Sequence, residues 1–121
     1  MYNIDIESKE QLLLFIKREC TDKIFEYLNG ITSIGEYSFY DCDNLINITI
    51  PETVKNIGKY AFSLCSNLST VTLKIFSPPE LENSNAFPSN VSIIYIPKGS
   101  LSNYQSAAQW SNLSSKFVEL Q

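Results

Sequence analysis

The chain has 121 residues, 44% of them hydrophobic and 18% charged, which is the composition of one globular domain rather than of a disordered segment. Its formal net charge of −4 argues against nucleic acid as a partner, because phosphate binding needs clustered Lys and Arg. The absence of histidine removes the usual general base and a common metal ligand, and three cysteines, an odd number, exclude a complete internal disulfide framework.

The first 30 residues are predicted to form an N-terminal cap with one helix and one strand. Ser8–Gln11 has the form of a capping box, and apolar residues then recur at helical spacing, which predicts a helix over 9–19. A first strand is expected at 23–27. The N-terminus lacks the basic and apolar regions of a signal peptide, and no apolar run in the chain reaches the roughly 18 residues of a membrane span.

Two stretches after this segment repeat each other. Residues 34–45 (IGEYSFYDCDNL) return as residues 57–68 (IGKYAFSLCSNL), and 57 − 34 gives an offset of 23 residues. A period of roughly 20–29 residues is the signature of a leucine-rich-repeat solenoid, in which each coil buries its apolar face by stacking on the next. We therefore predict a leucine-rich-repeat solenoid of the α/β-type repeat class. It is expected to be a short right-handed coil stack with one parallel sheet, its repeats spanning 31–98 of a single 1–121 domain.

The same offset predicts three strands, near 46–50, 69–73 and 92–96, where apolar and polar residues alternate. The outward positions of these strands form the expected partner-binding face: Asn47, Thr49, Thr70, Thr72, Ile93 and Tyr95. Ile93 and Tyr95 break its small polar character, and an exposed aromatic beside an aliphatic residue is a plausible contact point. The alternative is that the C-terminal segment covers both.

Other columns of the repeat are predicted to be structural. Gly35 and Gly58 are expected where the backbone takes a conformation that a side chain would hinder. Four aromatic residues are expected to fill the coil interior: Tyr37, Phe39, Tyr60 and Phe62. Three asparagines are expected to bond backbone groups at a bend as a ladder: Asn44, Asn67 and Asn90.

The third coil departs from the period. Ala86-Phe87 matches Ala61-Phe62 at an offset of 86 − 61, or 25 residues, before the strand column returns to 23. Two residues are therefore gained between 74 and 86 and two are lost after Phe87. The gain falls at a proline-rich stretch, so we expect a loop over 77–86 that is either a binding edge or a passive connection.

Residues 99–121 are predicted to form a C-terminal cap. Ser100 is placed to cap a short helix near 101–108. Four side chains are expected to cover the open end of the last coil: Tyr104, Ala107, Ala108 and Trp110. Phe117 and Leu120 are expected to add an edge strand.

Cys42 and Cys65 occupy one column, with Cys20 a possible third member. Stacked neighbours in adjacent coils allow a disulfide or a soft-metal site. The simpler interpretation, which we favour, is a column of buried thiols acting as small apolar residues. A structural zinc site usually needs four ligands, so no metal or cofactor is predicted. Glu36 and Lys59 are expected to form an exposed ion pair.

These residues resemble the BspA-like leucine-rich repeat proteins. The resemblance covers roughly residues 31–113 and is carried by the repeated columns and by an ending similar to that of the family: Ile34-Gly35, Phe39, Cys42, Leu45, Ile48, Ile50-Pro51, Val54, Ile57-Gly58, Ala61-Phe62, Cys65, Leu68, Ile96–Ser100, Tyr104 and Trp110. The family comprises bacterial and protozoan surface proteins with repeats of about this length. The resemblance implies adhesion to proteins and a cell-surface or secreted location, although this chain shows no signal peptide.

The favoured function is a non-catalytic interaction or adhesion module that binds a protein, or a glycan, through the strand face or the 77–86 loop. The alternative is a structural unit that caps or oligomerises a repeat array, because open solenoid ends expose strand edges. A carbohydrate-active enzyme is a third and weaker hypothesis, since no carboxylate pair or nucleophile stands out. The sequence leaves the partner and the oligomeric state open.

Overall fold

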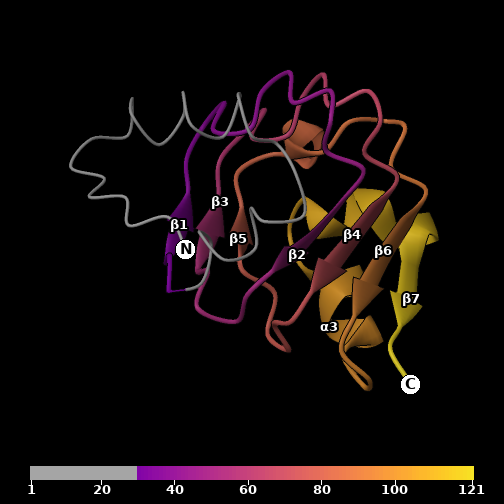
Figure 1. The fold of residues 1–121 in the computed structure, drawn as a ribbon. Coiled ribbons are helices and arrows are strands. Elements are labelled where there is room, and N and C mark those ends of the chain that lie inside the picture. Colours follow the sequence, from indigo (N-terminus) through magenta and orange to yellow (C-terminus); the bar gives the residue numbers. More distant parts are fainter. Residues whose placement is uncertain (1–29) are drawn as a thin grey trace.

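The structure is a computed structural model that describes residues 30–121. The predicted helix at 9–19, the predicted strand at 23–27 and Cys20 lie outside the described residues. The described chain winds in successive coils that stack from the end nearer the N-terminus to the C-terminus (Figure 1).

One side of the coil stack is a four-stranded parallel sheet. Its strands are β2 (Asn47–Ile50), β4 (Thr70–Leu73), β6 (Ile93–Ile96) and β7 (Phe117–Glu119), paired in the order β2-β4-β6-β7. The first three confirm the predicted strands, each beginning one residue later than expected. Asn47 pairs with Thr70 and Thr70 with Ile93, so the 23-residue offset is the pairing register of the sheet.

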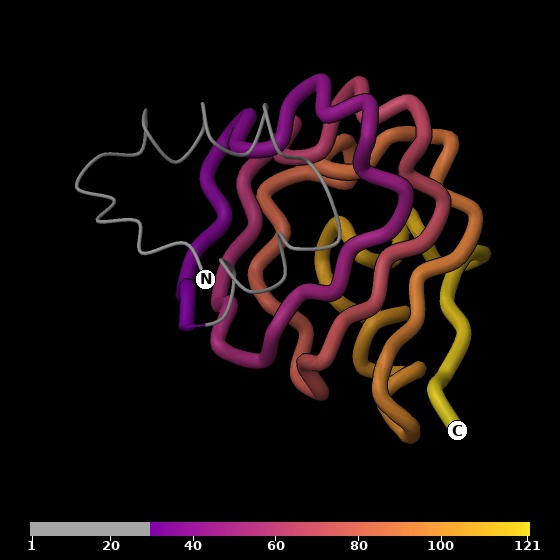
Figure 2. The backbone as a smooth tube through the Cα atoms, viewed as in Figure 1, coloured from indigo at the N-terminus to yellow at the C-terminus, as the bar shows by residue number. Residues whose placement is uncertain are grey.

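The other side of the stack is a second parallel sheet, which makes the prediction of one sheet wrong. Its strands are β1 (Ser33–Ile34), β3 (Asn56–Ile57) and β5 (Glu80–Leu81), in the order β1-β3-β5. Two residues are too few to show the alternation that identifies a strand in sequence. Figure 2 shows the chain crossing between the two sheets at the top and bottom of every coil.

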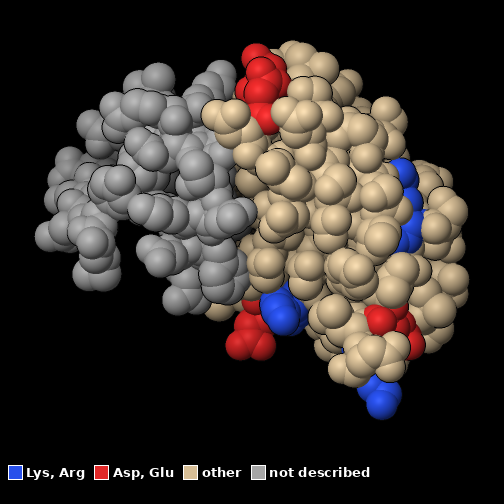
Figure 3. Space-filling view, turned by 45° about the vertical axis from the view of Figure 1, so that its right-hand side comes forward, with Lys and Arg blue, Asp and Glu red and all other residues tan. Residues whose placement is uncertain are grey.

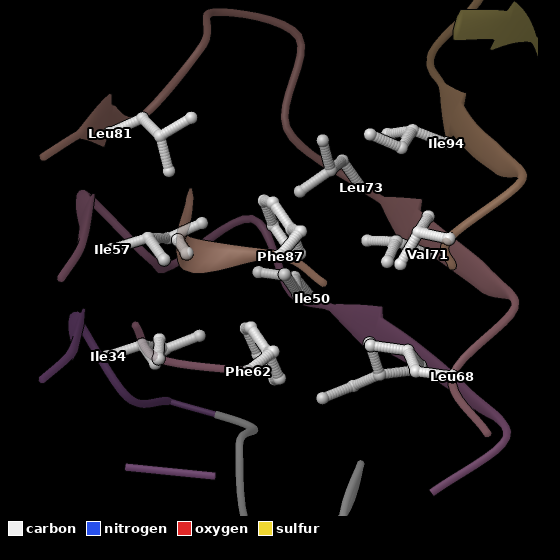
Figure 4. Close-up of a cluster of buried hydrophobic side chains, with 14 of the residues drawn as sticks. Ile34, Ile50, Ile57, Phe62, Leu68, Val71, Leu73, Leu81, Phe87 and Ile94 are labelled. Carbon is white, nitrogen blue, oxygen red and sulfur yellow. The ribbon is translucent and has the colours of Figure 1, made fainter. Parts of the chain in front are cut away.

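The core lies between the two sheets. In Figure 4, Ile34, Ile57 and Leu81 point inward from the three-stranded sheet toward Ile50 and Leu73 from the other sheet. This core confirms the inward placement of the repeated aliphatic columns.

A stack of phenylalanine rings fills the middle of the core. The Phe39 and Phe62 ring centroids are 4.9 Å apart and those of Phe62 and Phe87 5.3 Å, with the rings nearly parallel. The prediction that Tyr37 and Tyr60 also fill the interior is wrong. Tyr37 is 44% exposed, Tyr60 is partly exposed, and the two rings stack on each other at the corner of their coils.

Gly58 is required by close packing between coils. A Cβ atom built at Gly58 would lie 2.5 Å from the Glu36 backbone nitrogen, a distance at which the backbone would have to move. At Gly35 the nearest atom is the Ser38 hydroxyl oxygen, at 3.3 Å. The expected special backbone conformation is therefore wrong at both positions, because neither glycine has a positive φ; a side chain would instead disturb packing, against backbone at Gly58 and against a movable hydroxyl at Gly35.

The C-terminal segment consists of α3 (Leu101–Ser106), the 3₁₀ helix η2 (Trp110–Lys116) and β7. Tyr104 and Trp110 are buried, and each is tied to the preceding coil. The Tyr104 hydroxyl donates to the Ile75 carbonyl, and the Trp110 Nε1–H donates to the Pro79 carbonyl at 2.8 Å. The predicted edge strand is confirmed, because Phe117 begins β7, which pairs with β6; Leu120 follows the strand.

Two details of this segment differ from prediction. Ser100 precedes α3 but does not cap it with its side chain, because its hydroxyl donates to the Pro97 carbonyl at 2.6 Å. Ala108 is exposed rather than part of the cover, whereas Ala107 packs against the core. None of the helices in the described range is long and apolar enough to cross a membrane.

Candidate binding surfaces

The outer face of the four-stranded sheet is an uncharged surface that changes from polar to apolar along the stack. One row across the strands consists of Asn47, Thr70 and Ile93, and the next consists of Thr49, Thr72, Tyr95 and Val118. All seven side chains are exposed or partly exposed. Figure 3 turns the side of this sheet toward the viewer, and most of the visible described surface is uncharged, with a few charged clusters at the top, at the bottom and on the right-hand part.

The apolar end of this face is open. The C-terminal segment does not cover Ile93 and Tyr95, because β7 lies beside β6 and extends the sheet instead. It places Val118, 43% exposed, next to Tyr95 on the same face. Sequence reasoning missed Val118, although its place between Phe117 and Glu119 in a predicted edge strand was the available signal.

The 77–86 segment is more ordered than the loop that was predicted. It contains β5 and the 3₁₀ helix η1 (Ser84–Ala86), and its residues Pro79, Leu81 and Ala86 are buried. Ser77, Glu80 and Glu82 remain exposed. This segment is therefore largely part of the stack, and little of it is free to form a binding loop.

Glu82 of this segment bonds to Lys59, which was expected to pair with Glu36. Glu36 and Lys59 form no ion pair; instead the Lys59 backbone N–H donates to a Glu82 carboxylate oxygen at 3.0 Å. This hydrogen bond, together with a side-chain hydrogen bond to Glu36 and the charge of Lys59, lowers the pKa of Glu82 against the opposing effect of desolvation. Its effect is local and identifies no catalytic group.

The asparagine column has the predicted structural role at two of its three positions. The Asn67 side-chain amide donates to the Asp43 carbonyl at 2.6 Å, and that of Asn90 donates to the Leu68 and Cys65 carbonyls at 2.7 and 3.1 Å. Asn44 makes no comparable bond to residues 30–121. These bonds join the second coil to the first and the third coil to the second.

Cys42 and Cys65 are buried among apolar side chains. The Cys65 thiol donates to the Phe39 carbonyl at 3.0 Å, which ties the second coil to the first. Within the described residues, no group of three or more His, Cys, Asp or Glu side chains is arranged to hold a metal ion. Both thiols therefore contribute to packing.

A hollow of about 530 Å³ opens at the corner of the second and third coils. Its lining combines carboxylates, hydroxyls and apolar groups: Asp41, Asp43, Ser63, Leu64, Ser66, Phe87, Pro88, Ser89 and Asn90. Sequence reasoning missed this site. The available signal was the loss of two residues after Phe87, which indicates a shorter connection and hence a change in surface shape at this corner.

Comparison with known protein families identifies the family of this chain. No curated protein matches the sequence. A family model, described as the BspA type leucine-rich repeat region, matches residues 15–119 with six copies of the repeat. The match covers both described sheets and the C-terminal segment. The chain belongs to the BspA type leucine-rich repeat family.

Proposed function

We propose that this chain is a non-catalytic protein-interaction module that binds its partner through the outer face of the four-stranded sheet. The observation that carries the proposal is the uncharged face ending in Ile93, Tyr95 and Val118 on neighbouring strands. Tyrosine is one of the residues enriched among the energetically dominant contacts of protein interfaces, and the two aliphatic neighbours of Tyr95 add apolar area around it. Membership of a repeat family suited to extended contact surfaces supports the same function.

The geometry also favours binding over catalysis. A parallel sheet whose backbone is already paired presents its side chains on a rigid surface, so a partner bound there loses little to rearrangement of this chain. The segment 99–121 is proposed to act as a cap, because Tyr104 and Trp110 are buried against the last coil. The 77–86 segment contributes at most its exposed residues, Ser77, Glu80 and Glu82.

A display library of short peptides selected on the purified chain tests the proposal. Clones that bind the wild-type chain are expected to lose at least about tenfold in affinity for an Ile93→Ser/Tyr95→Ser variant, since anchor truncation commonly costs more than 1 kcal/mol. Phe76→Ser is the matched control, because Phe76 is a 51% exposed aromatic residue outside this face. Equal loss in the control, or no loss in the face variant, would contradict the proposed surface.

A second candidate function is assembly through β7. This strand is last in its sheet and pairs only with β6 within residues 30–121, so its other edge offers unpaired backbone groups. Light scattering on the wild-type chain and on a Glu119→Pro variant, which removes an N–H that alternates away from β6, distinguishes the two. Assembly through β7 predicts a concentration-dependent increase in mass that the proline abolishes, and a constant monomer mass would remove this candidate.

A further inference from the structure

The hollow between the second and third coils results from a shortened path of the chain. Phe62 and Leu68 are 68 − 62, or 6, positions apart in the second coil, whereas Phe87 and Val91 are 91 − 87, or 4, positions apart in the third. Both pairs are buried at matching places in the core. The connection at this corner is therefore two residues shorter in the third coil than in the second. As a result, the third coil does not cover the corner residues of the second coil on that side.

The apolar part of the hollow contains a leucine whose backbone has an unfavourable conformation. Leu64 is 57% exposed and has a φ of 59°, in the left-handed region that a leucine rarely adopts. Phe87 lines the hollow from below and is almost fully buried, with Pro88 beside it. The exposed Leu64 side chain forms an apolar wall of the hollow.

The polar part of the hollow contains two carboxylates, while the ammonium group of Lys116 donates to the Ser89 carbonyl of the lining at 3.4 Å and not to either carboxylate. Asp41 and Asp43 line it, and no lysine does. Asp43 accepts one hydrogen bond in the hollow, from the Ser66 hydroxyl at 3.2 Å. Within residues 30–121, neither carboxylate forms an ion pair. The Asn90 side-chain amide already donates hydrogen bonds to carbonyls of the second coil. The carboxylates are therefore the groups of the site that can accept hydrogen bonds from a ligand.

We propose that this hollow binds an arginine side chain of a protein partner. An arginine combines a planar cation, which hydrogen-bonds to carboxylates in two directions, with an aliphatic stem that covers apolar surface. The guanidinium is placed at Asp41 and Asp43, and the stem lies against Leu64 and Phe87. The inference rests on the proposed interaction function and adds to it a second contact surface and the chemistry of one partner residue.

An NMR titration with N-acetyl-arginine-N-methylamide tests this site. Saturable shifts are expected in the amides of 63–66 and 89–90, with dissociation constants on the order of millimolar, as is usual for one side chain. N-acetyl-citrulline-N-methylamide keeps the stem without the charge and is expected to bind at least about fivefold more weakly. Equal binding of citrulline, or shifts spread over the whole surface, would overturn the proposal.

Two variants separate the polar and apolar parts of the site. Asp41→Asn/Asp43→Asn is expected to weaken arginine binding at least about fivefold and to remove its dependence on salt. Leu64→Asn is expected to weaken binding while raising the melting temperature, because asparagine tolerates the left-handed backbone. Unchanged arginine affinity in either variant would refute the assigned contact. Matching shifts produced by calcium chloride in place of arginine would identify a metal-binding corner and also overturn the proposal.

The outcome is independent of the strand face. An Ile93→Ser/Tyr95→Ser variant is expected to bind the arginine probe as the wild-type chain does, because these residues do not line the hollow. Loss of peptide binding in that variant with an intact arginine titration would confirm both surfaces separately. Intact peptide binding to a chain that never binds arginine would remove the hollow and leave the proposed function standing.

Discussion

Replacing Phe62 with alanine tests the central packing of the coil stack. Phe62 is fully buried and lies between two parallel rings, with Phe39 at 4.9 Å and Phe87 at 5.3 Å between centroids. Truncation of a buried phenylalanine costs about 3–5 kcal/mol, and each lost ring pair adds to the loss from burial alone. We therefore expect a decrease of about 4–5 kcal/mol in the free energy of unfolding. For a chain of this length this corresponds to a fall of about 16–20 °C in melting temperature.

Phe76→Ala is the matched control, because it deletes the same atoms from a ring that is 51% exposed. Its expected cost is about 1 kcal/mol, in proportion to the apolar area that is buried. Urea unfolding followed by circular dichroism measures both variants, with the slope of each transition checked for two-state behaviour. Equal losses in the two variants, or a loss of less than about 1.3 kcal/mol in unfolding free energy for Phe62→Ala, would show that the ring stack does not hold the coils together.

Further substitutions test three separate parts of the structure. Gly58→Ala is expected to cost about 1–3 kcal/mol in unfolding free energy, because the new Cβ atom meets backbone atoms. Gly35→Ala is expected to cost less, because its Cβ atom meets only a movable hydroxyl. Urea midpoints that rank the two variants in reverse would contradict the close approach of the coils. Leu64→Asn is expected to stabilise the chain by about 0.5–1 kcal/mol by easing the left-handed backbone, and calorimetry showing a lower melting temperature would refute the strain. Burial raises the pKa of Tyr104 above its ordinary value of 10.0, so the neutral phenol stabilises the fold below about pH 10 and this stability is lost above it, by about 1.4 kcal/mol per pH unit. Tyr104→Phe is expected to flatten that slope and to cost about 1–3 kcal/mol at neutral pH, since the Ile75 carbonyl loses its donor; an unchanged slope between pH 9 and 11 would be the contrary result.

The repeated columns predicted the four-stranded sheet because strand pairing in a coil stack follows the sequence period. Ile48, Val71 and Ile94 share one column, and the structure pairs them directly across β2, β4 and β6. The same logic predicted that Phe39 and Phe62 fill the interior and that the asparagine column bonds backbone groups, as Asn67 and Asn90 do. It failed at Tyr37 and Tyr60, because a shared column shows that two residues are neighbours and not which way they point.

The candidate surfaces were predicted less completely than the fold. The alternation of polar and apolar residues alone predicted the six outward-facing residues of β2, β4 and β6, because alternation can be recognised in strands of four residues. Val118 joined that face only through the pairing of β7 with β6, which links residues far apart in sequence. The 77–86 segment looked like a loop because of its prolines, yet β5 inside it pairs with β3 and carries a buried leucine.

By itself the sequence determined that the chain is a stack of coils, since apolar columns at a constant 23-residue offset are buried only when successive repeats lie side by side. It also determined which residues of the longer strands face outward. Only the tertiary structure decided that a second sheet closes each coil, because strands of two residues are defined by their partners and not by their pattern. It likewise decided that the two residues missing from the third coil open a hollow, because the shape of a corner depends on the coil beside it.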